Sequence, residues 1–197
     1  MRRIAHIGAL CALAILINGC AGPQSHFFTL SRVAAPASPA ATAANLSVVV
    51  GPVSIPAIVD LPQIVVNTGP NQVALDEFNR WASPLQNNIS RVVAENLVVL
   101  LGTPRVSLFQ QSLNADADYR VAIEVQTFES APGEAATLNA VWLVRNTRDG
   151  RSQTGRTTVR EPSPSKAYED LAAAHSRALA RMSQDIADAI RGLDRAH

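Results

Sequence analysis

The sequence is poor in cysteine, with only Cys11 and Cys20 among its 197 residues. An isolated cysteine can be a nucleophile, a metal ligand, half of a disulfide or an attachment point for another group. Cys20 follows an apolar run and precedes a polar one, in the stretch AILINGCAGPQS. The residues around it must therefore decide its role.

No apolar run near the N-terminus is long enough to span a membrane. The chain begins Met1-Arg2-Arg3 and is then almost uncharged from Ile4 to Ile17, which is typical of a secretory signal. A transmembrane helix needs about 20 apolar residues, and Asn18-Gly19 interrupts the run before that length. The pattern therefore favours a cleaved signal peptide over residues 1–19.

The segment Ile17-Asn18-Gly19-Cys20 resembles the bacterial lipobox. In precursors with this motif the cysteine sulfur carries a diacylglycerol, the signal is cut after Gly19, and the new amino terminus is acylated. We therefore expect Cys20 to be the lipidation site and Gly19–Cys20 to be the cleavage site. An unmodified cysteine at the end of a buried helix is the alternative. Cys11 would leave with the signal, so the mature chain would hold no free thiol.

Lipidation would anchor the protein to a membrane. One fatty chain binds reversibly, whereas three chains such as palmitate, at about 0.8 kcal/mol per buried methylene, would hold essentially permanently. The residue after the cysteine is Ala21. In lipoproteins of double-membraned bacteria an Asp at this position retains the protein at the inner membrane. By resemblance, Ala21 indicates the periplasmic side of the outer membrane.

The sequence also lacks an excess of charge of one sign. The 17 Lys and Arg residues balance 16 Asp and Glu residues, and no run of basic residues occurs. Removal of Arg2 and Arg3 with the signal would make the mature chain slightly acidic. A nucleic-acid partner is therefore not expected, because such proteins track phosphates with clustered basic residues.

Common catalytic and metal motifs are missing: the sequence has no GxSxG, P-loop, dinucleotide glycine pattern or HExxH. Residues 114–118 imitate half of a calcium loop, but Tyr119 stands where Gly is needed and Val125 where the bidentate Glu belongs. His175 lies on an apolar stripe and is predicted to be a core histidine bonded to a backbone carbonyl rather than a general base. We expect no enzyme activity, no metal and no cofactor beyond the lipid on Cys20.

Composition divides the chain after the signal into two parts. Ser31 to Asn45 is rich in Ala, Pro and Ser, so residues 20–45 are predicted to be a lipidated N-terminus and tether. Within it, the apolar patch His26–Leu30 either lies on lipid headgroups or packs on the domain. Residues 46–197 are predicted to form one domain.

Hydrophobic periodicity predicts an α+β domain with a mixed, largely antiparallel sheet of about six or seven strands and two helices packed on it. Ser83 and Gln86 are predicted to form a capping box at the start of the first helix, and Gly102 to end it. The second helix begins after Lys166. The predicted strands cover residues 46–53, 63–68, 72–78, 105–109, 119–128, 136–145 and 152–159.

Asn79, Arg80 and Trp81 form the candidate partner contact. They follow a polar strand and directly precede the first helix. A tryptophan beside an arginine is typical of the anchors that dominate protein interfaces. The alternative, which the sequence leaves open, is that Trp81 packs at the edge of the core.

Several segments together resemble the ABC-type transport auxiliary lipoproteins, the family of PqiC, with the lipobox where that family has it. The similarity extends over about residues 46–192 and is carried by Ile55-Pro56, Leu61–Val66, Asn79–Leu85, Ala94–Leu97 and Ala173–Leu179.

The resemblance implies an outer-membrane lipoprotein that serves as an accessory or docking subunit of a lipid transport system and maintains envelope integrity. Its expected partners are an MCE-domain protein that spans the periplasm and the inner-membrane transporter components, and a homo-oligomer is possible. A periplasmic carrier lipoprotein, which would hold an amphiphile between sheet and helices, is the alternative function.

Overall fold

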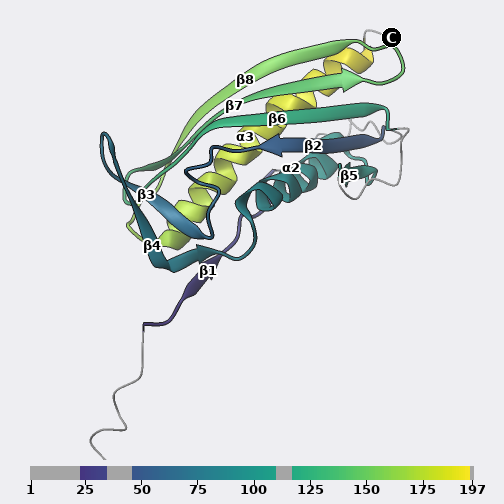
Figure 1. The fold of residues 1–197 in the computed structure, drawn as a ribbon. Coiled ribbons are helices and arrows are strands. Elements are labelled where there is room, and N and C mark those ends of the chain that lie inside the picture. Colours follow the sequence, from purple (N-terminus) through teal and green to yellow (C-terminus); the bar gives the residue numbers. More distant parts are fainter. Residues whose placement is uncertain (1–22, 35–45, 110–116, 196–197) are drawn as a thin grey trace, which may run out of the picture.

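The computed structural model describes residues 23–34, 46–109 and 117–195. In these ranges the chain forms two helices and eight strands (Figure 1). In chain order they are β1 (His26–Phe28), β2 (Val48–Ser54), β3 (Gln63–Gly69), β4 (Gln72–Trp81), α2 (Leu85–Leu101), β5 (Val106–Leu108), β6 (Tyr119–Ala131), β7 (Ala135–Asn146), β8 (Ser152–Pro162) and α3 (Tyr168–Arg195).

The strands divide into two sheets. A large sheet has the order β5-β2-β6-β7-β8, and a small one has the order β1-β4-β3. The pairs β1–β4, β2–β5 and β2–β6 are parallel, whereas β3–β4, β6–β7 and β7–β8 are antiparallel hairpins. The α+β prediction is confirmed. The division of the strands into two sheets was not predicted from the sequence.

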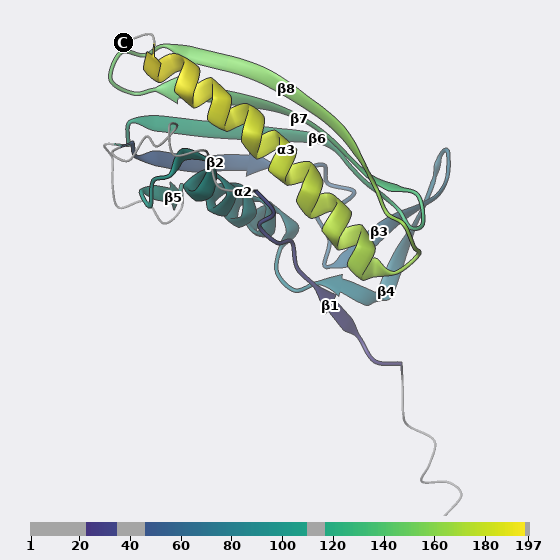
Figure 2. The ribbon, with the colours of Figure 1, turned by 180° about the vertical axis from the view of Figure 1, so that it is seen from behind.

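Helix α3 covers one face of the large sheet. Along β6, Tyr119, Val121 and Ile123 are buried, whereas Arg120 and Glu124 are exposed. Figure 2 shows α3 running along the face of β6, β7 and β8. The predicted apolar stripe of this helix is buried against the sheet: Leu171, His175, Leu179, Met182, Ile186 and Ile190. No described helix is long and apolar enough to cross a membrane.

Helix α2 starts differently from the prediction. Pro84 is the N-cap residue, and no side chain caps the helix. The capping box is therefore a correction: the Gln86 side-chain amide donates to the carbonyl of Val53 on β2 instead of closing on Ser83. A contact with a neighbouring strand has replaced a local one. The C-terminus agrees with the prediction, because Gly102 adopts a left-handed conformation with φ of 66°.

Residues 26–34, which precede the predicted start of the domain at residue 46, are part of the domain. Strand β1 pairs with β4, aligning His26 with Asn79 and Phe28 with Trp81. Leu30, just after β1, is 1% exposed and belongs to the hydrophobic core. Of the two interpretations of His26–Leu30, packing on the domain is correct for Phe28 and Leu30, whereas His26 and Phe27 remain exposed.

The next residues, Ser31 to Ala34, lie along both helices. The Ser31 N–H donates to Ser176 Oγ on α3 at 3.0 Å, and the N–H groups of Val33 and Ala34 donate to Asn96 Oδ1 on α2 at 3.2 and 3.1 Å. The tether prediction is therefore wrong for Ser31–Ala34, and the domain begins earlier than residue 46. Composition could not show this, because the bonds come from side chains far along the chain. Residues 35–45 lie outside the described residues.

Candidate functional site

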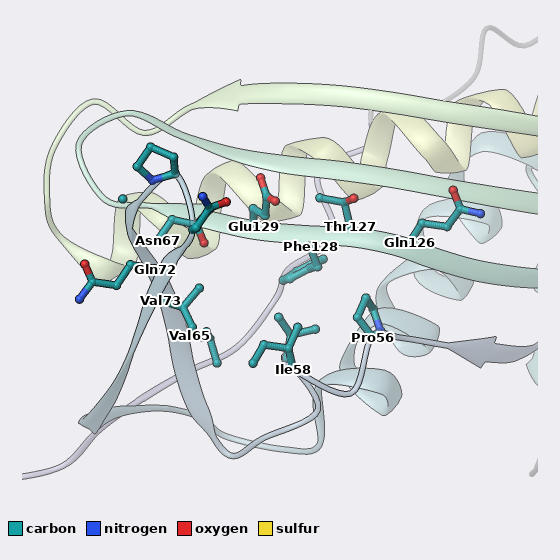
Figure 3. Close-up of a pocket in the computed structure, with 14 residues that line it drawn as sticks. Pro56, Ile58, Val65, Asn67, Gln72, Val73, Gln126, Thr127, Phe128 and Glu129 are labelled. Carbon is teal, nitrogen blue, oxygen red and sulfur yellow. The ribbon is translucent and has the colours of Figure 1, made fainter.

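A groove opens between the β3–β4 hairpin and strand β6 (Figure 3). Its volume is about 200 Å³. Three parts of the chain line it: the loop at Pro56–Val59, the hairpin from Val65 to Val73, and the stretch Gln126–Glu129 of β6. In Figure 3, Val65 and Val73 lie on the hairpin side, while Phe128 and Ile58 lie across from them.

The rim of this groove combines exposed apolar side chains with polar ones such as Asn67, Gln72 and Gln126. Val65 pairs with Leu75, and Asn67 pairs with Val73, so these four side chains share one face of the hairpin. Val65 is buried, whereas Val73 is 42% and Ile58 is 55% exposed. An exposed apolar patch with polar groups beside it is typical of an interaction surface.

Beneath the groove, Phe128 belongs to a packed aromatic cluster. Its ring stacks on His175 with centroids 3.9 Å apart and planes 8° from parallel. Trp81 meets both rings edge-on, with centroid distances of 6.3 Å. This cluster of Phe128, His175 and Trp81 connects β4, β6 and α3, so the floor of the groove is anchored in the core.

His175 is a core residue, as predicted, but its partner is different. Its Nε2 lies 2.8 Å from Ser130 Oγ rather than from a backbone carbonyl, and Nδ1 has no hydrogen-bond partner among the described residues. Burial lowers the pKa of His175 to about 3, because the charged ring would lose its hydration. The ring is therefore neutral near pH 7 and has no path to a substrate at the surface.

The predicted contact of Asn79, Arg80 and Trp81 does not form one surface. Trp81 is 6% exposed and packs in the aromatic cluster, so its interpretation as an interface anchor is corrected in favour of core packing. The Asn79 amide donates to Asp76 Oδ2 at 3.0 Å. Arg80 is part-exposed, with Nη2 3.9 Å from Glu77 Oε2. Successive strand residues point to opposite faces, which separates Arg80 from Trp81.

The sequence analysis missed Asp76, which fastens the hairpin. Its carboxylate accepts hydrogen bonds from the Tyr168 hydroxyl at 2.7 Å and from the N–H groups of Phe78 and Asn79 at 2.9 Å. Burial alone would raise the pKa of Asp76, but these bonds outweigh it and lower the pKa to about 2. The sequence signal was the residue type: an Asp side chain can accept hydrogen bonds from backbone N–H groups two and three residues ahead. Tyr168, at the start of α3, could not be found from sequence spacing.

The residues that imitate a calcium loop are engaged elsewhere. Asp118 Oδ2 accepts from the N–H and the hydroxyl of Ser47, each at 2.8 Å, and Oδ1 pairs with Arg148. Burial raises the pKa of Asp118, but the bonds from Ser47 and the Arg148 charge outweigh it, so the pKa lies below its usual value. Within the described ranges no group of three or more His, Cys, Asp and Glu could hold a metal. Residues 114–116, Gly19 and Cys20 lie outside those ranges.

A second groove, of about 540 Å³, lies between β2, β5 and the first turns of α2. One wall is apolar and includes Val50, Pro52, Leu108 and Phe109, and the other holds Gln86, Asn87, Ser90 and Arg91. The Arg91 side chain makes bonds within the domain: Nη1 pairs with Glu95 at 2.8 Å, and Nη2 donates to the Leu30 carbonyl at 2.7 Å. This groove combines apolar walls with polar groups at its rim.

The described residues form an α+β domain of two helices, a three-stranded sheet and a five-stranded sheet, with grooves on its surface. The chain belongs to the family of ABC-type transport auxiliary lipoprotein components, whose model matches residues 28–187. It is thus an auxiliary lipoprotein component of ABC-type transport systems. The match starts within β1, in agreement with the packing of that segment on the domain.

Solved structures share this fold. Protein XCC0632 from Xanthomonas campestris, described under family-model DUF330, superposes with a TM-score of 0.69 at 24% identity, over 87% of this chain and 99% of that one. A second, uncharacterised protein gives a TM-score of 0.70 at 20% identity, over 85% and 99% of the two chains. The PelC dodecamer from Paraburkholderia phytofirmans, at 13% identity over 80% and 97%, has a TM-score of 0.38, too low to indicate a shared assembly. No curated protein matches the chain.

Proposed function

We propose that the protein is an outer-membrane lipoprotein that docks an MCE-type lipid transport system to the membrane. In this proposal the signal is cleaved after Gly19 and Cys20 carries the lipid. The domain then faces the periplasm and contacts an MCE-domain protein whose inner-membrane partners supply the transport activity. The protein itself would catalyse no reaction. Membership of the auxiliary lipoprotein family supports this role.

The observation that carries the docking role is the exposure of apolar side chains at the rim of the hairpin groove. Val73 and Leu75 are among the most exposed large hydrophobic residues of the domain, although their neighbours Val65 and Phe128 are buried. Exposed apolar side chains add little to the free energy of folding. Their burial against a partner would stabilise a complex by roughly 25 cal/mol per Å² of apolar surface. We therefore place the partner contact at Ile58, Val73 and Leu75.

The test is a matched pair of charge substitutions. Val73→Glu places a carboxylate in the groove rim, whereas Leu143→Glu places one on an apolar residue of similar exposure, 38%, on the large sheet. Co-purification with the MCE-domain protein of the same organism should fall about thirty-fold or more for Val73→Glu, which corresponds to about 2 kcal/mol at an interface anchor. Leu143→Glu should bind as the unchanged protein does. Equal binding by both variants, with unchanged melting temperatures, would remove the groove as the docking site.

Carriage of an amphiphile is the second candidate function, and the groove beside α2 supports it. Its volume lies within the range of about 300–1,000 Å³ that is common for ligand pockets, and its walls are partly apolar. A carrier lipoprotein purified from the membrane fraction should hold bound phospholipid, detectable by mass spectrometry after extraction. Ser90→Trp would fill this groove and should then abolish the lipid signal while leaving MCE co-purification intact.

A further inference from the structure

We infer that the face of the small sheet formed by β1 and β4 rests on the bilayer that carries the lipid anchor. Phe27 and Phe78 would enter the headgroup region, and Arg80 would meet lipid phosphates. This inference rests on the proposed lipidation of Cys20. It goes beyond the docking role because it defines which end of the domain faces the membrane.

The first observation is the short distance along the chain. His26 is only six residues after Cys20, and a fully extended chain spans at most about 3.3–3.6 Å per residue. A lipid on Cys20 would therefore hold β1 within about 20 Å of the bilayer surface. Because β1 pairs with β4 and is not part of a long tether, this limit applies to the domain itself.

The second observation is the exposure of two phenylalanines at that end. Phe27 is 64% and Phe78 is 43% exposed, while Phe28, the next residue after Phe27, packs against Tyr168 with ring centroids 5.8 Å apart. Strand alternation turns Phe27 away from the core while Phe28 faces it. An exposed aromatic residue beside a lipid attachment point has the character of an interfacial anchor.

The third observation is the cross-strand partner of Phe27. The register aligns Phe27 with Arg80, and directly opposed residues of neighbouring strands lie on the same face. The Arg80 side chain is part-exposed, and within the described ranges its ion pair is a distant one, with Nη2 3.9 Å from Glu77 Oε2. An arginine beside a phenylalanine can bury its aliphatic stem next to the ring and keep its charge at the level of the phosphates.

The shape of the domain agrees with this orientation. In Figures 1 and 2 the described chain starts next to β1 and β4, whereas the C-terminal end of α3 and the β7–β8 turn lie at the opposite end of the domain. With β1 on the membrane, that opposite end projects into the periplasm. The hairpin groove is lined by residues at the turn end of β3 and β4, far along β4 from Arg80, and remains open to a partner.

The test uses the scarcity of cysteine. In the mature acylated protein Cys11 is lost and the Cys20 sulfur is blocked, so His26→Cys creates a single reactive thiol beside Phe27 without removing either phenylalanine. A polarity-sensitive dye on this thiol is measured with the full acylated protein in vesicles of phosphatidylethanolamine and phosphatidylglycerol, with and without brominated acyl chains. The matched control is Thr154→Cys, an exposed position on β8 near the opposite end.

We expect bromolipids to quench the dye at position 26 several-fold more than the dye at position 154. Adding Phe27→Ser and Phe78→Ser to the His26→Cys protein should return the quenching close to the control. Both phenylalanines are exposed, so the melting temperature should not fall, and Phe27→Ser alone serves if the double variant unfolds. Quenching that survives these changes would overturn the inference, because proximity through the lipid alone would then explain it.

Two further outcomes separate this inference from the proposed function. If the protein floats with the vesicles but the dye at position 26 stays in water, the inferred bilayer contact is wrong. The proposed lipid anchor would still stand. The face would then be open or covered by another protein or a second copy. If a thiol reagent labels Cys20 and the protein does not float with the vesicles, Cys20 carries no lipid. That result would overturn the proposed lipid anchor and this inference together.

Discussion

The two sheets of this domain differ in what covers them. The large sheet buries one face under α3, and its alternating pattern is clear along β6 and β7. The small sheet meets α3 at Tyr168, which contacts Phe28 and Asp76, and it leaves Val73, Leu75 and Phe78 on β4 exposed. The small sheet thus leaves apolar side chains exposed on β4, and these are the surface that the proposed partner contact uses.

The largest effect is expected where the two sheets join. Trp81→Ala removes the indole that packs edge-on against Phe128 and His175, and a large-to-small change of this kind costs about 3–5 kcal/mol. Chemical denaturation should show this loss for the whole domain. A variant that keeps its stability and loses only partner binding would show that Trp81 is an interface residue after all, and that the sheets are not coupled through it.

A second substitution measures the core beneath the helices. Leu97 on α2 is fully buried, so Leu97→Ala should leave a cavity that costs about 2–5 kcal/mol. The control is Arg181→Ala on α3: this side chain is 75% exposed and lies 3.9 Å from Glu161, so its loss should stay within about 0.5 kcal/mol. Similar melting shifts for the two variants would contradict the assignment of the buried helix faces.

A smaller, pH-dependent effect is expected at the hairpin. The pKa of Asp76 is lower in the folded protein, about 2, than its ordinary value of 3.8. The carboxylate therefore stabilises the folded state fully above about pH 4, and this contribution is lost as the pH falls towards 2. Asp76→Asn should reduce the melting temperature near neutral pH and flatten its fall between these pH values.

Asp60→Asn, at an exposed carboxylate in the loop before β3, is the control for this measurement. It should leave the melting temperature near neutral pH unchanged. If Asp76→Asn and the unchanged protein lose stability in parallel as the solution is acidified, the hydrogen bonds of Asp76 do not hold the hairpin to α3.

Much of the fold could be predicted from local patterns, for definite reasons. Strands β6 and β7 and helices α2 and α3 bury one side and expose the other, so their periods are visible in the sequence. Gly102 and Gly150 adopt positive φ angles of 66° and 76°, which glycine accepts readily, so the helix end and the turn could be located from these residues. The capping box failed because Gln86 found a partner on β2, which no local rule contains.

The site was less predictable, because its parts come from distant segments. The sequence identified Trp81 as a candidate contact residue but left open whether it packs in the core or at an interface. The neighbours that decide this, Phe128 and His175, come from β6 and α3. The same holds for Asp76, whose hydrogen bond to Tyr168 spans 92 residues.

The sequence by itself determined the α+β class and the family, because alternation, helical periodicity and local motifs are properties of neighbouring residues. It also predicted the lipid attachment at Cys20, which stays a prediction. Only the tertiary structure decided that residues 26–34 belong to the domain, that the strands form two sheets, and that the hairpin exposes apolar side chains at a groove. These features depend on hydrogen bonds and packing between segments far apart in the chain, such as Ser31 with Ser176, whose free energy no local pattern encodes.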